Sequence, residues 1–294
     1  MINPRKAGCR LAAFLIACVP LALAQGTYTQ IDYPGAFSTF VTGTNTAGDV
    51  VGFFAWFGGP VYGFVLSQGV YTPIVGNGND EVWPYSINDF GQVVGMTVGS
   101  TRGGFLYDIN TKVFTTFKYP TEHNFTEPFS INNAGTIAGT IRVELPQRNF
   151  NVGFVLSGGV YEVIQQKSLV TTSVTGINNL GQIVGYGSTT GDYPNIGFIL
   201  DEGKFQRLRI QPDQVNGIND AGVIVGSYRA PSATSGFVLP KGGAPQPLNF
   251  PGNIVETVAV SVNNLGVVSG WFSDSVGFAS HGFLWTPPPD AAKK

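Results

Sequence analysis

The sequence predicts an all-β fold, a six-bladed β-propeller with four antiparallel strands in each blade. The first observation behind this prediction is a tetrad, Asn-x-x-Gly, that recurs six times with its asparagines 43, 44, 46, 41 and 44 residues apart. A fixed period of this length is typical of propellers, solenoids and other repeat arrays. The second observation is a Gly-Phe pair that follows each tetrad, and the third is the form of the two ends of the repeat region.

Each repeat contains four short β-prone runs. The first run ends at the tetrad asparagine, the second follows the tetrad, the third begins with Gly-Phe, and the fourth alternates, as in residues 161–164. The apolar runs are continuous because neighbouring blades would cover both faces of each sheet. We expect the glycines that end the second run and begin the third to leave bare backbone, on which an aromatic ring from the adjacent blade lies.

The tetrad is interpreted as a structural turn. In a short hairpin the asparagine accepts a hydrogen bond from the backbone two residues on, and the glycine supplies a left-handed residue. The alternative is that six asparagines surround a ligand or metal, but a calcium loop needs alternating carboxylates that Asn-Asn-Leu-Gly lacks. The turn residues are Asn45 and Gly48, Asn88 and Gly91, Asn132 and Gly135, Asn178 and Gly181, Asn219 and Gly222, and Asn263 and Gly266.

The ends of the repeat region predict how the ring closes. Residues 28–32 form a fourth-type strand with no strands before it, and residues 282–285 form a third-type strand with no fourth after it. The N-terminal strand should therefore pair beside the last strand and complete the last blade, which removes the open sheet edges. The predicted organisation is a signal peptide over residues 1–24, the propeller over 25–286 and a short tail over 287–294.

The N-terminal segment has the pattern of an export signal. Three basic residues precede an apolar stretch at residues 11–23, and Ala22-Leu-Ala24 forms a small-x-small cleavage site. The stretch is short and interrupted by Pro20, so it is not expected to span a membrane. The run that ends at Cys18 also resembles a lipoprotein box, which would leave a lipid anchor on this cysteine as the alternative. The predicted location is extracellular or periplasmic.

The composition of the chain limits the kinds of site and partner that are expected. Cys9 and Cys18 are the only cysteines, and both lie in the signal, so the mature chain has no disulfide or thiol ligand. Charged residues make up 12% of the chain, the net charge is −2 and no basic cluster occurs, which argues against nucleic acid and anionic membranes as partners. His123 and His281 are too few for a multi-histidine metal site, so no metal or cofactor is predicted.

The repeats resemble those of the extracellular HAF-repeat proteins of bacteria. The likeness rests on Gly-Ile-Asn-x-x-Gly-x-Ile-Val-Gly, as in residues 176–185, on His-Gly-Phe at 281–283, and on Pro-Gly segments at 34–35 and 251–252. It extends over residues 28–286, with small departures, since only the last repeat has histidine before Gly-Phe. The resemblance implies secretion and a repeat fold, and it implies no particular activity or site.

Function is predicted to lie on the loops between the second and third strands and between blades. These loops vary in length among the repeats, and they emerge at the end of the ring opposite the uniform tetrad turns. Aromatic and planar polar side chains there could bind a glycan or a protein. Inward-folded loop plugs are the alternative for Trp83, Phe125 and Phe150. The predicted ligand-binding residues are Trp56, Phe57, Trp83, Tyr85, Arg148, Asn149, Phe150, Tyr193, Arg229 and Phe278.

The function predicted from these patterns is a secreted, non-catalytic binding or scaffold module for an extracellular polysaccharide or protein partner. The chain has no Gly-x-Ser-x-Gly nucleophile motif. The alternative is a carbohydrate-active enzyme, a glycosidase or lyase, in which carboxylates from different blades meet in the central channel. The carboxylates available for such a site are Asp80, Glu81, Glu122, Glu127, Asp192, Asp213, Glu256 and Asp274.

Overall fold

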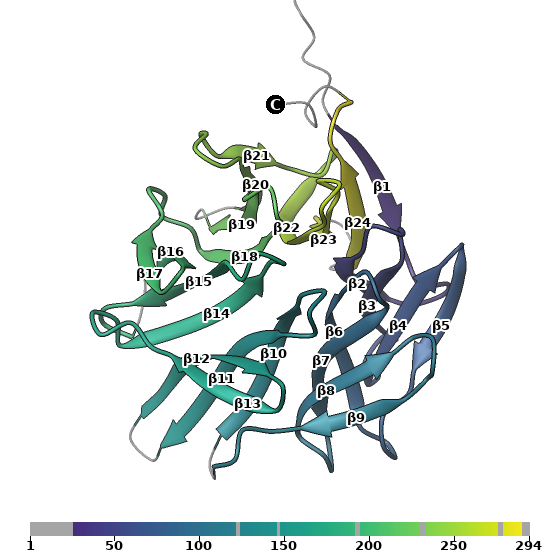
Figure 1. Ribbon diagram of the computed structural model, residues 1–294. Helices are drawn as coiled ribbons and strands as arrows, with labels where there is room; N and C mark the ends of the chain where they lie inside the picture. Colours follow the sequence, from purple (N-terminus) through teal and green to yellow (C-terminus); the bar gives the residue numbers. More distant parts are fainter. Residues whose placement is uncertain are drawn as a thin grey trace, which may run out of the picture.

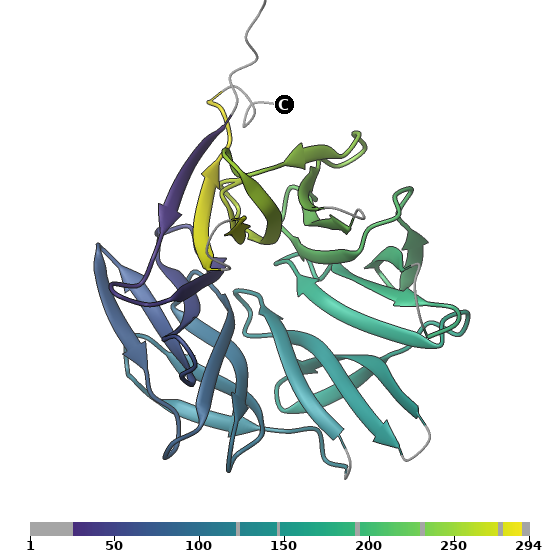
Figure 2. The same ribbon diagram turned by 180° about the vertical axis from the view of Figure 1, so that it is seen from behind.

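The computed structural model describes residues 26–121, 124–145, 148–191, 195–229, 233–275 and 279–289. These residues form 24 β-strands (Figures 1 and 2). Strand formation follows from the β-branched and aromatic content of the short apolar runs. The part of the chain described here contains no helix with the length and apolar character needed to cross a membrane.

Pairing groups the strands in six units of four. Unit 1 consists of β2 (Ser38–Thr44), β3 (Val50–Ala55), β4 (Val61–Ser67) and β5 (Val70–Ile74). Unit 2 consists of β6 (Glu81–Ile87), β7 (Gln92–Val98), β8 (Gly103–Asp108) and β9 (Phe114–Phe117). Unit 3 consists of β10 (Asn124–Ile131), β11 (Ile137–Leu145), β12 (Arg148–Ser157) and β13 (Val160–Ile164).

The second half of the chain repeats the arrangement. Unit 4 consists of β14 (Thr171–Ile177), β15 (Ile183–Ser188), β16 (Ile196–Asp201) and β17 (Lys204–Arg207). Unit 5 consists of β18 (Gln214–Ile218), β19 (Ile224–Arg229), β20 (Thr234–Leu239) and β21 (Gln246–Leu248). Unit 6 consists of β22 (Ile254–Val262), β23 (Val268–Asp274), β24 (Ser280–Thr286) and β1 (Thr27–Ile31).

The first strand of the chain pairs with the last. β1 runs antiparallel to β24, with Thr27 opposite Thr286 and Ile31 opposite Gly282, which is the pairing that the chain ends predict. β2 of unit 1 contacts β22, β23 and β24 of unit 6. Figures 1 and 2 show the units arranged around a common centre, with β1 beside β24. The fold is therefore all-β and propeller-like.

Units 5 and 6 are joined more closely than the other neighbouring units. A parallel bridge between Thr234 of β20 and Glu256 of β22 makes these eight strands one continuous sheet. The bridge forms because β22 begins nine residues before its tetrad asparagine and so reaches past the usual start of an inner strand. Because β18 and β22 are the inner strands of these units, this junction lies beside the centre of the molecule.

The phenylalanines of the third strands form the middle of the core. Each one is fully buried, and they are Phe64, Phe105, Phe154, Phe198, Phe237 and Phe283. Each ring lies over a glycine within the second strand of its own unit, as with Phe198, whose Cζ would be 2.8 Å from a Cβ at Gly185. The expectation that the ring comes from the adjacent blade is wrong, because Gly185 and Phe198 are direct cross-strand partners.

Several glycines of the third strands face the adjacent unit, where they meet aliphatic side chains or proline. A Cβ added at Gly153 would be 3.2 Å from Cβ of Val174, and one at Gly63 would be 2.8 Å from Cγ of Pro84. At the closure, a Cβ at Gly282 of unit 6 would overlap the Val41 side chain of unit 1. Absence of a side chain at these positions thus allows neighbouring units to pack closely.

The tetrad asparagines link the units as well as shaping the turns. Inside each turn, the glycine amide donates to the asparagine carbonyl and the glycine φ lies between 75° and 87°, as the turn interpretation predicts. In addition, each asparagine Nδ2 donates to the backbone oxygen of the next asparagine, at 2.9–3.3 Å. These bonds run from Asn45 to Asn88, Asn88 to Asn132, Asn132 to Asn178, Asn178 to Asn219, Asn219 to Asn263 and Asn263 to Asn45.

We expect Asn178→Ala to lower the free energy of unfolding by about 2–4 kcal/mol, because it leaves several buried polar groups without partners. Oδ1 of Asn178 accepts from the amides of Leu180 and Gln182, and Nδ2 donates to Oε1 of Gln182 and to the Asn219 oxygen. Urea denaturation measures the loss. Leu180→Ala in the same turn is the control, since this side chain is 67% exposed. Equal losses for the two variants would contradict the role of Asn178 between units.

Candidate functional site

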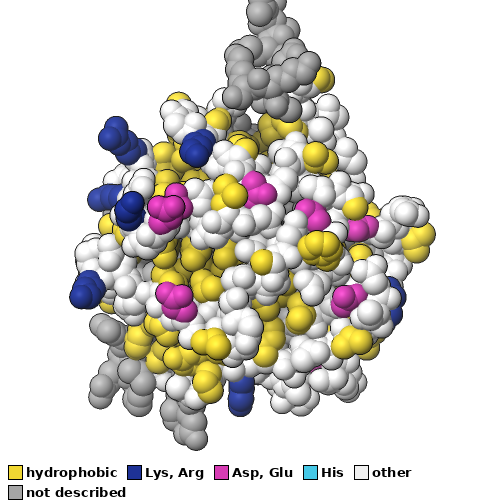
Figure 3. Space-filling view, in the orientation of Figure 1, with side chains coloured by type: hydrophobic (Ala, Val, Ile, Leu, Met, Phe, Trp, Pro, Cys, Tyr) yellow, Lys and Arg dark blue, Asp and Glu magenta, His cyan; other side chains and the backbone are white. Residues whose placement is uncertain are grey.

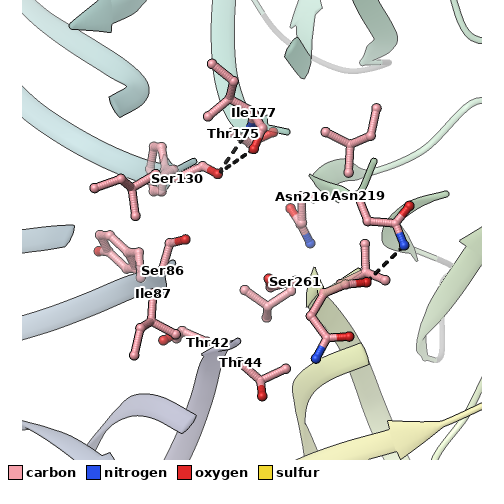
Figure 4. A pocket seen from close by; sticks show the side chains of 18 of the residues that line it. Thr42, Thr44, Ser86, Ile87, Ser130, Thr175, Ile177, Asn216, Asn219 and Ser261 are labelled. Atoms are coloured by element: carbon pink, nitrogen blue, oxygen red, sulfur yellow. Dashed lines mark hydrogen bonds between the residues drawn. The ribbon is translucent and has the colours of Figure 1, made fainter. Parts of the chain in front are cut away.

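A central cavity of about 550 Å³ lies between the inner strands of the six units. β2, β6, β10, β14, β18 and β22 all contribute to its lining, so it is formed only when the units assemble. Figure 4 shows Thr42, Thr175 and Asn216, from three different units, around this common space. The volume is in the range of pockets that hold small molecules.

Six β-bulges place side chains in the cavity. In every inner strand the ladder skips the residue three positions before the tetrad asparagine, and a β-bulge re-aims the side chain of such an unpaired residue. All six skipped residues line the cavity. We call them the bulge ring, and they are Thr42, Tyr85, Phe129, Thr175, Asn216 and Val260.

The bulge ring has an aromatic side and a polar side. The rings of Tyr85 and Phe129 lie 5.1 Å apart and form the aromatic side. On the polar side, Oγ1 of Thr175 donates to the Val215 oxygen at 2.6 Å, and Nδ2 of Asn216 donates to the Ala259 oxygen at 2.8 Å. The hydroxyl hydrogen of Thr175 is thus used within the protein, whereas Asn216 has a second hydrogen on Nδ2, and the oxygens of both side chains can accept hydrogen bonds.

Burial and the nearby Glu127 carboxylate raise the pKa of Tyr85. Its hydroxyl therefore stays protonated across the physiological pH range. Tyr85 was predicted as a residue of the loop rim. It lies instead within β6 and lines the cavity, because the bulge turns its side chain inward.

Charged side chains line both ends of the cavity. At the end formed by the tetrad turns these are Asp89 and Asp220, and at the opposite end they are Asp213, Glu256 and Arg229. The Asp213 side chain is 5% exposed, and its Oδ2 lies 3.5 Å from Nε of Arg229. Because Arg229 and Glu256 belong to different units, this opening, which we call the mouth, is at the junction of units 5 and 6.

Trp56 and Phe57 lie on the rim, at the end of the molecule opposite the tetrad turns. Phe57 is 84% exposed and Trp56 is 42% exposed. Phe37 and Tyr62, exposed by 37% and 42%, lie close by. The Phe37 and Phe57 rings are 5.0 Å apart, and the rings of Trp56 and Tyr62 each lie 5.5 Å from Phe54. These four exposed residues form what we call the rim cluster.

Trp83 packs against neighbouring residues within the fold, whereas it was predicted as a ligand-binding residue of the loop rim. It lies in β6, its ring centre is 4.7 Å from that of Phe53, and its Nε1 donates to Glu81 at 3.2 Å. Glu81 also accepts the amide of Val61 in unit 1. This carboxylate therefore connects two units, and Trp83 is half-buried against them.

In unit 3, three predicted rim residues belong to a strand and not to a loop. Asn149 and Phe150 belong to β12, with Asn149 opposite Glu144 and Phe150 opposite Val143, and the backbone of Arg148 pairs with Leu145. Asn149 is exposed and Phe150 is half-buried. Among the other predicted rim residues, Arg229 is exposed at the mouth, whereas Tyr193 and Phe278 are outside the described residues.

The predicted channel carboxylates are distributed over several environments. Asp213 and Glu256 line the cavity, whereas Asp80, Glu81, Glu127 and Asp274 are not among its lining residues. Burial raises the pKa of Glu127 despite the nearby guanidinium groups of Arg142 and Arg102. Glu122 and Asp192 lie outside the described residues.

Asp80 holds the loop between β7 and β8. Hydrogen bonds from Thr101, and then from Ser100, lower the pKa of Asp80 from 3.8 to about 2, against the opposing effect of desolvation. A carboxylate with a depressed folded-state pKa contributes stability above its unfolded value and loses it as the pH falls. We therefore expect NMR titration to place the Asp80 pKa near 2, so that the loop loosens as the pH falls from 4 towards 2. A value near 3.8 would contradict this account.

His281 is part of the closing seam. Its Nδ1 lies 3.0 Å from Oδ1 of Asp32, and its ring stacks on Phe272 at 5.2 Å. His123 is outside the described residues, and the described residues contain no group of three or more His, Cys, Asp and Glu side chains that could hold a metal ion.

No protein-family model and no curated protein matches the chain. Solved structures do match. A mutant of the Aleuria aurantia lectin in complex with Fucα1-6GlcNAc is 10% identical with a TM-score of 0.53, over 85% of this chain and 92% of that chain. An oligogalacturonate lyase in complex with manganese is 12% identical with a TM-score of 0.52, over 92% and 98% of the two chains.

A streptogramin B lyase is 10% identical with a TM-score of 0.51, over 89% of this chain and 98% of that chain. At such low identities these likenesses establish the fold alone. They place the chain among all-β, propeller-like proteins, and the three proteins differ in what they do.

Sequence reasoning named the mouth residues Asp213, Glu256 and Arg229 without bringing them together, and of the bulge ring it named only Tyr85 as a site residue. The signal for the bulge ring was present, because its residues occupy one fixed position before each tetrad and differ from repeat to repeat. This contrasts with the constant asparagine three residues later. Variation at one position of a constant framework is a sign that side chains there serve something other than the framework.

Proposed function

We propose that the protein is an exported, non-catalytic binding module that recognises an extracellular polysaccharide. In this proposal the six units are the blades of a closed six-bladed propeller of the HAF-repeat kind, and residues 1–24 are a cleaved signal peptide. The tetrad turns serve as the rigid side of the scaffold. The rim cluster and the mouth, at the opposite end, form the binding face.

The observation that carries the proposal is the exposure of the rim cluster. Four aromatic side chains, Phe37, Trp56, Phe57 and Tyr62, are 37–84% exposed and gathered at one place. Exposed aromatic groups of this kind mark interaction sites. Flat aromatic faces suit the apolar faces of sugar rings, and Tyr and Trp add polar atoms for hydroxyl groups. Binding of a protein partner to the same cluster would change the proposed ligand from a polysaccharide to a protein.

The arrangement of the carboxylates favours binding over catalysis. Asp213, the most buried acid of the cavity, is held beside the Arg229 guanidinium in an ion pair, so its carboxylate is already engaged within the protein. Asp80 and Glu81 hold a loop and a contact between units. A carbohydrate-active enzyme that uses Asp213 and Glu256 remains the second candidate, supported by their shared position at the mouth.

A glycan array followed by a turnover assay tests the proposal. We expect the full mature protein to bind one class of polysaccharide and to leave it unchanged, with no new reducing ends and no unsaturated product after long incubation. Cleavage that is lost in Glu256→Gln would instead establish the enzyme. Absence of any glycan binding, together with capture of a protein ligand that depends on Phe57, would replace the polysaccharide with a protein partner.

A further inference from the structure

We infer that the central cavity is a second binding site, separate from the rim cluster, and that it selects a protonated amino sugar. The inference rests on the proposed glycan function, because the cavity opens at the mouth on the same end of the molecule as the rim cluster. It begins from the bulge ring, whose residues occupy one fixed position before the constant tetrad asparagine and vary among the repeats.

The shape of the bulge ring suits one sugar unit. A pyranose ring has apolar C–H faces and a polar edge. Tyr85 and Phe129 offer neighbouring flat rings, 5.1 Å apart, on one side. Thr42 and Thr175 flank this pair around the ring, and Asn216 lies across from it beside Val260, so three of the other four positions offer polar atoms. The cavity of about 550 Å³ has room for such a ligand and the water around it.

The hydrogen bonds that the bulge-ring side chains make within the protein favour a ligand that has hydrogen-bond donors. Oγ1 of Thr42 donates to the Pro84 oxygen at 2.9 Å, and Thr175 and Asn216 make equivalent bonds to the next unit. Each of these three side chains therefore has an oxygen that can accept a hydrogen bond in the cavity, and Asn216 also keeps one N–H donor. Hydroxyl and ammonium groups of a ligand supply the matching hydrogens.

Charge selects the ammonium group. The lining contains four carboxylates, Asp89, Asp213, Asp220 and Glu256, and one guanidinium, that of Arg229. A cleft lined mainly by one sign of charge concentrates ligands of the opposite sign. Figure 3 shows Lys and Arg side chains mostly near the outline of the face drawn there, with Asp and Glu side chains nearer its middle. A sugar acid is therefore disfavoured, and an amino sugar is favoured over a neutral one.

Ligand-observed NMR titration with four probes tests this inference. The probes are glucosamine, N-acetylglucosamine, glucose and glucuronate, at a pH where the amine is protonated. We expect glucosamine to bind at least about tenfold more tightly than N-acetylglucosamine, as a charge-assisted contact requires, and glucuronate to bind most weakly. Equal binding of glucosamine and glucose, or a preference for glucuronate, would overturn the inference.

Two matched variants assign the preference to the cavity. Glu256→Gln should reduce the preference for glucosamine over N-acetylglucosamine to less than about threefold, since it removes one lining charge. Glu144→Gln makes the same charge change on the β11–β12 hairpin, outside the cavity lining, and should leave the preference intact. If both variants behave alike, the charge does not act in the cavity.

Trp56→Ala separates this inference from the proposed function. Trp56 belongs to the rim cluster and does not line the cavity, so glucosamine selectivity should persist in this variant. Polysaccharide binding that is lost in Trp56→Ala, without any amine preference in the wild-type protein, would sustain the proposed function and overturn the cavity site. An amine preference that disappears in Trp56→Ala would place the amino sugar on the rim.

Discussion

Deletion of residues 26–32 should lower the free energy of unfolding by more than about 4 kcal/mol, because it removes two well-packed side chains and a whole strand. Ile31 is 7% exposed, and the Tyr28 ring packs edge-on against Phe250 and Phe283 at 5.3 and 5.7 Å. The deletion would also leave β24 as an open edge, and open edges promote aggregation. Thermal unfolding followed by light scattering measures both effects.

Deletion of residues 288–294, which follow β24, is the matched control. It removes the same number of residues from the other end of the chain without breaking the pairing between β1 and β24. We expect its melting temperature to stay close to that of the full chain. An unchanged melting temperature in the N-terminal deletion would show that the β1–β24 pairing does not hold the first and last units together.

Gly185→Ala should cost at least about 3 kcal/mol through overpacking at a site with no room to adjust. A Cβ at this position would overlap the Ser173 carbonyl oxygen and would lie 2.8 Å from Cζ of the fully buried Phe198. The added methyl group would be confined between backbone on one side and a core ring on the other, and neither can move away from it. Chemical denaturation of the purified variant measures the loss.

Gly181→Ala is the informative comparison, because it adds the same methyl group in the same repeat. Gly181 has a φ of +79° and no atom within 4 Å of the position of an added Cβ. Its cost should be limited to the strain of a left-handed alanine, about 1 kcal/mol. If Gly181→Ala proved more costly than Gly185→Ala, the role assigned to the second-strand glycines in core packing would be incorrect.

The strands and turns could be predicted from the sequence because their residues act locally. Asn178 and Gly181 form their turn from bonds within a few residues, and the 3.0 Å bond from Asn178 to Asn219 simply joins two copies of that turn. The link itself could not be predicted, since it depends on the angle between neighbouring units. The same reason explains why the ring over Gly185 was expected from another blade, whereas it comes from the paired strand.

The candidate site was harder to predict because it depends on interruptions of the regular pattern. The regular alternation of side chains along β6 does not predict that Tyr85 enters the cavity, because a bulge at that point changes the side-chain direction. Trp83, two residues earlier, was treated as equivalent but packs on Phe53. Trp56 and Phe57 were easier to place, because they follow the last residue of β3 in a short loop. Their ligand role stays a prediction.

The central claim is that binding takes place on the face opposite the tetrad turns. Isothermal titration of the polysaccharide from the array into Trp56→Ala and Phe90→Ala tests it most directly. Phe90 is the matched residue, an aromatic side chain that is 63% exposed at a tetrad turn. We predict that Trp56→Ala weakens binding by about 30-fold or more, equivalent to about 2 kcal/mol, and that Phe90→Ala changes it by less than about twofold. Loss of affinity in Phe90→Ala with unchanged affinity in Trp56→Ala would contradict the claim and place the binding face at the tetrad turns.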